Sequence, residues 1–374
     1  MVICFDVTTE ARTALETLMQ TGQFEDTSEA VSIALVNYQV IHRAVSKRAP
    51  RVMENKPSTV RTEKSPVNST EKPVTGGTSI PELFSLENVS WDGLDLREIP
   101  DVPAAEFPPA RWLFGQYNKF LPVKAACRGL LTMLCHRPGG APVAEAIKTI
   151  STEAWVLGDY LYMLDQGSSR SREDAFAAAF PTTAGNGARS RLRFGNQFIG
   201  DLRQPKKTED QLREIKFNGL PAALQFIVCT DGKNPVLQLT RPGAEFAALK
   251  SPILDSGAAK PDRKFSEPET EFMLAHLRRA VPEEVSAYAS IIDAITEGAN
   301  TPDELDEYLC ARFHLEIAAT AEEENQITKT FLTTQRTGAI SRMVDLGLVA
   351  REKAGLRVTY LVTAQGKTFK DTSR

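Results

Sequence analysis

The chain has few of the residues that build metal centres and disulfide frameworks. It holds 4 histidines and 5 cysteines in 374 residues, and no Cys-x-x-Cys pair. This scarcity argues against a zinc site or a disulfide scaffold, so no cofactor is expected. No run of residues approaches the ~20 apolar residues of a membrane span, and the opening MVICFDVTTEA lacks the basic-then-apolar order of a signal peptide. These absences predict a cytoplasmic protein with no membrane partner.

A convincing catalytic motif is also absent. The sequence has neither the phosphate-binding Gly-x-x-x-x-Gly-Lys-[Ser/Thr] nor the nucleophile motif Gly-x-Ser-x-Gly. The best candidate is Asp201 followed by Glu214 and Lys216, which loosely resembles the acidic residue and Glu-x-Lys of metal-dependent nucleases. Such short matches arise by chance in many chains, and this one lies in a charge-rich run. The chain is therefore expected not to be an enzyme, with a metal-dependent nuclease as the alternative.

Charge is strongly segregated along the chain. The overall net charge is −4, but the segments carry −4 (1–45), +4 (46–80), −6 (81–110), +6 (111–255), −10 (256–324) and +6 (325–374). Compact cationic blocks inside an acidic chain can still bind a polyanion locally. The acidic balance therefore does not exclude nucleic acid as a partner.

Composition divides the chain into five parts. Residues 46–80 lack aromatic residues and are rich in Pro, Ser, Thr, Lys and Glu, which predicts a disordered basic linker. Residues 81–110 are acidic and proline-rich yet carry aromatic residues, which predicts an arm lying across a neighbouring surface. The linker isolates residues 1–45, and two longer blocks follow the arm. We refer to residues 111–255 as the first block and to residues 256–374 as the second block.

Residues 1–45 begin with apolar side chains at every second position, which is typical of one short strand, and continue with two amphipathic helices. One strand is unstable without a partner, so the module predicts an intertwined homodimer. The dimer contacts are expected at Ile3, Phe5, Val7, Leu35 and Tyr38. This order resembles the ribbon-helix-helix family. Because Asp6 and the net negative charge disfavour phosphate contacts, dimerisation is favoured over direct DNA reading.

The end of the second block combines a helix with a strand hairpin. Helices are expected at about 269–281, 283–297 and 302–313, followed by a further helix that ends at Gly347. The string DLGLVARE…GLRVTYLVTAQG then alternates as two strands, and this order resembles the winged-helix family. The resemblance implies a recognition helix and a wing that contact DNA through Thr333, Thr334, Gln335, Arg336, Thr337, Ser341, Arg342, Lys353 and Arg357. The alternative is a solvated helix face used for protein contacts.

The first block shows a looser version of the same pattern. In NGARSRLRFGNQFIGDLRQPKK, the apolar face is formed by Phe194, Phe198, Ile199 and Leu202. The polar side chains expected to bind DNA are Arg189, Arg191, Arg193, Asn196, Gln197, Arg203, Lys206 and Lys207, with Lys233 in the hairpin turn 231–234. LTRPGAEFAAL then parallels LVTAQGKTF of the second block. This resembles a divergent winged helix, and the alternative is a helix-hairpin unit with an ordinary charged surface.

Together these patterns predict a mainly α protein with small β-hairpins (α+β). The expected function is a homodimeric double-stranded DNA-binding protein, most simply a transcriptional regulator of the repressor type that is nucleoid-associated in the cytoplasm. Two alternatives remain open. One is a plasmid-type replication initiator, and the other is a DNA-binding adaptor of a partition, nuclease or defence complex. In the adaptor, the acidic segments 81–110 and 256–324 would contact other proteins.

Overall fold

A computed structural model of the chain describes residues 79–86, 89, 91, 93–166, 168, 171–185, 187–203, 216–230, 234–255, 263–318, 326–355 and 357–372. The chain divides into two units, residues 1–70 and 71–374, and every described residue belongs to the second unit. The N-terminal module, with Ile3, Phe5, Val7, Leu35 and Tyr38, lies outside the described residues. So does the linker, except for its last two residues.

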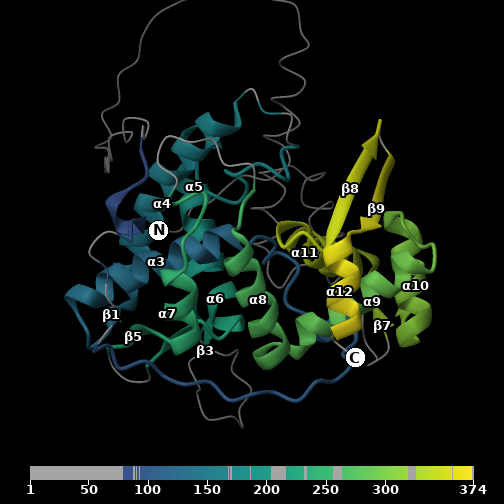
Figure 1. Ribbon diagram of the computed structural model, residues 1–374, viewed down its shortest axis with the longest axis horizontal. Coiled ribbons are helices and arrows are strands. Elements are labelled where there is room, and N and C mark those ends of the chain that lie inside the picture. The colour runs from purple at the N-terminus through teal and green to yellow at the C-terminus, as the bar shows by residue number, and fades with distance from the viewer. Residues whose placement is uncertain are drawn as a thin grey trace, which may run out of the picture. The chain divides into compact units, whose positions relative to one another are not determined.

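The described residues are mainly helical with small sheets, as expected (Figure 1). The arm and the first block contain the short turns η1 (Glu82–Phe84), η2 (Pro109–Arg111) and η3 (Thr183–Gly185), the helices α3 (Leu121–His136), α4 (Val143–Asp165), α5 (Gly187–Phe194), α6 (Leu220–Ala223) and α7 (Arg241–Ala248), and the π-helical turn η4 (Gly195–Ile199). The strands of the first block are β1 (Ala141–Pro142), β2 (Asp201–Arg203), β3 (Lys216–Asn218), β4 (Ile227–Cys229) and β5 (Val236–Leu239).

Among its described residues, the second block has four helices before its long hairpin and one after it. They are α8 (Glu267–Ala280), α9 (Pro282–Thr296), α10 (Pro302–Phe313), α11 (Lys329–Asp345) and α12 (Ala364–Thr372). The strands are β6 (Glu316–Ile317), β7 (Gln326–Ile327), β8 (Val349–Ala354) and β9 (Arg357–Val362). The predicted helices of this block are confirmed within about two residues, because local caps set their starts: Ser266 forms a capping box with Glu269, and Thr301 forms one with Glu304.

Both predicted hairpins are confirmed as antiparallel pairs. Strands β8 and β9 pair from Val349↔Val362 to Ala354↔Arg357, and Figure 1 shows them as a ribbon that projects beyond the helices. In the first block, β4 and β5 pair on either side of the expected turn, and β1 adds a third strand through Ala141↔Leu237. The sheet order is therefore β1-β5-β4.

In both blocks, a threonine directly after the second hairpin strand makes the same hydrogen bonds. We call this turn the corner. In the first block, Thr240 N donates to the Phe226 carbonyl at 3.0 Å, and Thr240 Oγ1 caps α7 by accepting from Gly243 N. In the second block, Thr363 N donates to the Leu348 carbonyl at 3.1 Å, and Thr363 Oγ1 accepts from the N–H of the glycine three residues later. The parallel between LTRPGAEFAAL and LVTAQGKTF therefore extends to individual hydrogen bonds.

The glycine of each corner is fixed by a close backbone approach. A Cβ atom at Gly243 would lie 2.1 Å from the Phe226 carbonyl oxygen, and one at Gly366 would lie 2.2 Å from the Leu348 carbonyl oxygen. Three residues before each corner threonine, the second hairpin strand pairs with a segment that joins two earlier helices, α3 and α4 in the first block and α9 and α10 in the second. Leu237 pairs with Ala141, and Tyr360 N donates to the Asn300 carbonyl. The described elements from α9 to α12 thus repeat the strand pairing and the corner of the first block.

A hairpin interrupts the helical path of the first block. The chain leaves the path at Gly200 and returns at Gly219, where an added Cβ would lie 2.8 Å from the Gly200 Cα. Both glycines have positive φ, 144° and 143°, and β2 pairs with β3 between them. The expectation of one apolar face that includes Leu202 is therefore wrong, because Leu202 lies on β2. Phe194, Phe198 and Ile199 are buried as expected.

The arm lies along both blocks. Arg241 N donates to the Arg97 carbonyl at 2.9 Å, Val102 N donates to the Arg279 carbonyl at 2.8 Å, and Phe107 N donates to Ser286 Oγ at 2.8 Å. Its carboxylates pair with arginines in Glu98–Arg241, Asp101–Arg279 and Glu106–Arg312, of which Arg241 and Arg279 are exposed and Arg312 is half-buried. These contacts attach the arm to the surface through its backbone as well as its charges.

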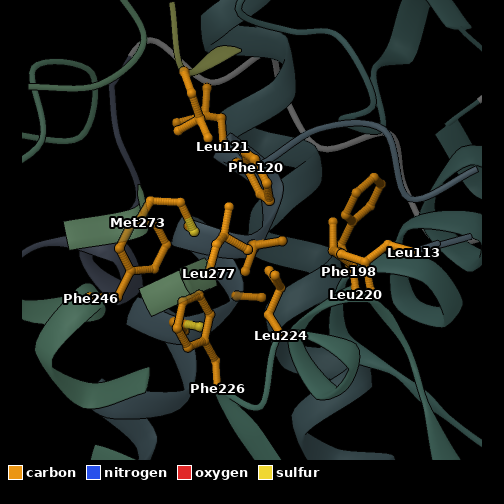
Figure 2. Packing of buried hydrophobic residues seen from close by; sticks show 14 of the residues in the cluster. Leu113, Phe120, Leu121, Phe198, Leu220, Leu224, Phe226, Phe246, Met273 and Leu277 are labelled. Carbon is orange, nitrogen blue, oxygen red and sulfur yellow. The ribbon is translucent and has the colours of Figure 1, made fainter. Parts of the chain in front are cut away.

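One hydrophobic core runs through both blocks. Phe226 and Phe246 of the first block gather with Met273 and Leu277 of α8 (Figure 2). One buried ion pair joins the two blocks, and a second lies at the end of the first block. Lys124 Nζ, near the start of α3, lies 3.0 Å from Glu269 Oε1 of α8. Arg128 Nη2 contacts Asp255 Oδ2 at 2.6 Å.

Candidate nucleic-acid interface

A hollow of about 340 Å³ brings predicted DNA-binding residues of both blocks together. We call it the inter-block hollow. Arg193 of α5 and Gln197 of η4 line it from the first block, and Thr337 and Ser341 of α11 line it from the second. Arg351 of β8, which was not among the predicted residues, also lines it. Residues more than 140 positions apart in the sequence therefore share one concave surface.

The first-block side is an amphipathic helix with an exposed cationic face. Phe194 and Phe198 are buried with ring centroids 5.6 Å apart, and they anchor the helical path. The four-residue spacing then places Arg189, Arg193 and Gln197 on a common face. Arg189 and Arg193 are exposed, and Arg193 Nε donates to Gln197 Oε1 at 3.2 Å.

Other predicted residues of this segment differ in their surroundings. The Arg191 guanidinium lies 5.7 Å from the centroid of the Trp155 ring, an arrangement typical of a cation–π contact. Asn196 is half-buried on η4. Arg203 lies on β2, and its backbone pairs with Lys216 of β3. Lys206, Lys207 and Lys233 lie outside the described residues.

On the second-block side of the hollow, fewer residues are accessible than the sequence predicts. On α11, Thr337 is exposed, and Thr333 and Thr334 are half-buried. Thr333 Oγ1 donates to Asp306 Oδ2 at 3.1 Å. Gln335, Arg336, Ser341 and Arg342 are at most 5% exposed, so placing them on a polar outer face is wrong.

Each of the long buried side chains has an internal partner. Arg336 Nε donates to Asp306 Oδ1 of α10 at 2.6 Å, and Arg342 Nε donates to Glu284 Oε1 of α9 at 2.5 Å. Gln335 Oε1 accepts from Gly115 N at 2.5 Å. These charges are compensated inside the protein, which leaves Arg336 and Arg342 unable to reach a base edge without breaking a buried pair.

Helix α11 is buried on two sides because the segment before α3 crosses it closely. A Cβ atom at Gly338 would lie 2.2 Å from the Gly115 carbonyl oxygen, and one at Gly115 would lie 2.0 Å from the Thr334 carbonyl oxygen. The missing side chains let two backbones touch. The face that carries Gln335 and Arg342 is therefore covered by the residues around Gly115.

The β8–β9 hairpin carries cations at its end. Lys353 and Arg357 are exposed, and they flank the turn at Gly355, which has φ of 63°. Arg351, closer to the helices, pairs with Glu173 at 2.6 Å and with Asp174 at 3.5 Å. The tip residues are thus accessible, whereas Arg351 is held against the first block.

Sequence reasoning missed Lys119, which lines the inter-block hollow just before α3. Its side chain is 5% exposed, and its Nζ lies 3.6 Å from Asp345 Oδ1. Burial lowers the pKa of Lys119, and Asp345 partly opposes that effect. No motif surrounds Lys119 in the sequence, so only the fold identifies it.

The residues of the nuclease alternative are only partly described. Asp201 lies on β2 and Lys216 on β3, where their backbone partners are Asn218 and Arg203, and Glu214 lies outside the described residues. Within the described part of the chain, no group of three or more His, Cys, Asp or Glu side chains is arranged to hold a metal ion. The same residues contain no helix with the length and apolarity to cross a bilayer.

No protein-family model, curated protein or solved structure matches this chain.

Proposed function

We propose that the chain is a double-stranded DNA-binding protein that acts as a homodimeric transcriptional regulator of the repressor type. One observation carries the proposal: the cationic face of α5 and η4 meets α11 at the inter-block hollow. Arg189 and Arg193 are long, exposed cations suited to neutralising backbone phosphates. Thr337 adds a hydroxyl that can donate to phosphate oxygens.

The element order of both blocks supports this proposal. In the second block, α9, α10 and α11 precede the β8–β9 hairpin, and the segment between α9 and α10 pairs with β9 through Asn300. In the first block, β1 between α3 and α4 pairs with β5 in the same way. A helical group followed by a two-stranded wing is the arrangement of winged-helix DNA-binding domains. We therefore propose one such unit in each block.

The buried state of Gln335 and Arg336 shifts the proposed reading of bases to the first block. Gln197 lies on the same face as Arg193, and its amide can pair with an adenine edge in the major groove. Gln197 Nε2 now donates to Gln116 Oε1 at 3.3 Å, an exposed contact that a base can replace. Lys353 and Arg357 at the hairpin tip would contact the flanking backbone.

Binding titrations of the full chain with a fluorescent duplex test the proposal. Arg193→Ala should weaken binding and reduce the slope of log affinity against log salt by about 0.9, the value for one lost phosphate contact. Arg241→Ala is the matched control, because Arg241 is also exposed but pairs with Glu98 of the arm and does not line the hollow. Equal affinities and slopes for wild type and both variants would refute a DNA interface at the hollow.

A replication initiator is the second candidate, and the repeated corner at Thr240 and Thr363 favours it. Two like units in tandem suit consecutive segments of an iterated DNA repeat. Footprinting on the DNA around the coding sequence separates the roles. One protected site at the protein's own promoter supports the regulator, iterated protected repeats support the initiator, and uniform weak protection supports a sequence-independent adaptor.

A further inference from the structure

Lys119 is a buried cation with incomplete compensation. Its Nζ has no hydrogen-bond partner among the described residues, although the side chain is only 5% exposed. A buried ammonium group normally donates to several acceptors, because its desolvation is otherwise costly. Lys119 is therefore the kind of group that a bound ligand would complete.

The neighbouring carboxylate does not provide this compensation, because a second lysine uses it. Asp345 Oδ1 accepts from Lys264 Nζ at 2.8 Å, and Asp345 Oδ2 accepts from Phe120 N at 3.2 Å. Lys119 Nζ is farther away, at 3.6 Å. One carboxylate thus serves two ammonium groups, and its hydrogen bonds go to Lys264 and Phe120 rather than to Lys119.

The other described charged residues around the hollow leave Lys119 Nζ without a hydrogen-bonded acceptor. Glu173 lines the hollow and pairs with Arg351 at 2.6 Å, and Asp174 lies 3.5 Å from the same guanidinium. Arg193 is exposed at the rim. Thr337 and Ser341 supply hydroxyl donors from α11. The buried ammonium group, the exposed guanidinium and the hydroxyl groups surround a hollow of about 340 Å³. Such a set of donors matches a group with several strong acceptor oxygens.

We propose that the inter-block hollow binds a phosphate group, with Lys119 as its buried anchor and Arg193 and Thr337 as outer contacts. The proposal deepens the DNA-binding function and rests on it for one of two phosphate sources, the DNA backbone. The other source is a free phosphate group, whose binding would connect α5 and η4 with α11. Both sources share the same recognition chemistry, and the experiment separates them.

The experiment compares full-length wild type with Lys119→Met and Lys148→Met. Methionine keeps most of the side-chain length and removes the charge. Lys119→Met should fold, because Asp345 retains Lys264 and Phe120 as partners. Lys148 is exposed on α4 and does not line the hollow, so its variant controls for the loss of one charge. Thr337→Val, at an exposed position, is a second variant of the hollow that leaves the core untouched.

Two measurements are made on each protein. The first is calorimetric titration with inorganic phosphate at constant ionic strength, and the second is duplex binding at several salt concentrations. Phosphate binding that becomes roughly tenfold weaker or more in Lys119→Met, with normal binding in Lys148→Met, supports the proposal. Thr337→Val should weaken it by a smaller factor.

The duplex measurement identifies the source. A salt slope that falls by about 0.9 in Lys119→Met alone assigns the hollow to a DNA phosphate. Unchanged duplex binding together with lost phosphate binding assigns it to a free phosphate group. If wild type binds no duplex at all, the DNA-binding function fails while the phosphate titration still decides this proposal. If Lys119→Met matches wild type in both measurements, the proposal is overturned.

Discussion

Replacing Arg336 separates the structural role of this side chain from a role in reading DNA. Arg336 is 3% exposed and makes two contacts with Asp306, at 2.6 and 3.2 Å. Arg336→Met keeps most of the stem packing and removes the guanidinium. Among the described residues, the Thr333 hydroxyl is then the remaining side-chain donor to the Asp306 carboxylate. We therefore expect a loss of stability and no change in the discrimination between DNA sequences.

The expected loss follows from the buried pair. Removing one partner of a buried ion pair costs about 3 to 5 kcal/mol, and the retained Thr333 contact favours the lower value. For a unit of roughly 300 residues, an unfolding entropy of about 2.1 cal/mol/K per residue gives ~0.6 kcal/mol/K in total. A loss of about 3 kcal/mol then lowers the melting temperature by roughly 5 °C.

The assay is thermal unfolding of Arg336→Met, Asp306→Leu and the double variant, with duplex binding measured well below each midpoint. The double variant should recover much of the stability, because apolar replacement of both partners of a buried pair is often close to neutral. The reasoning is refuted if Arg336→Met melts like wild type and binds a footprinted site no better than a random duplex. That result would mean that Arg336 leaves Asp306 to read DNA.

Three further predictions concern other parts of the chain. His276 is 3% exposed, and burial lowers its pKa to about 4 from 6.5. The unfolded chain therefore binds the extra proton first, and acid unfolding should show that stability is lost as the pH falls from 6.5 through 4, by about 3 kcal/mol, a loss absent in His276→Gln. Gly243→Ala should destabilise the fold, because its Cβ would meet the Phe226 carbonyl oxygen at 2.1 Å. A melting temperature equal to that of wild type would contradict this contact. Phe5→Asp, outside the described residues, should yield monomers in light scattering, and a persistent dimer would remove the ribbon-helix-helix interpretation.

Much of the fold was predictable because its causes are local. The caps at Ser266 and Thr301 mark helix starts within a few residues of sequence. Alternation around Gly355 marks a hairpin, and the two strands pair as expected. Leu202 shows the limit of this reasoning. The apolar period continues past Gly200, but the positive φ there ends the helical path and sends the chain into β2.

The candidate site was predictable only in part. Arg189 and Arg193 lie four positions apart on α5, beside the buried Phe194, so their exposure follows from the local helical pattern. Lys119 had no such pattern. Its importance comes from a hollow whose lining spans Asn118 to Arg351, and no local window contains both ends.

The amino-acid sequence determined the helices, the hairpins and the segregation of charge, because each depends on neighbours within a few residues. The tertiary structure decided which charges face inward. Arg336 pairs with Asp306, which lies 30 positions earlier in the sequence, and Arg342 pairs with Glu284, which lies 58 positions earlier. The sequence around a helical arginine does not show whether its guanidinium group faces water or pairs with a buried carboxylate. Its environment is set by the segments that pack over the helix, here those around Gly115 and on α9 and α10, and these segments meet only when the chain folds.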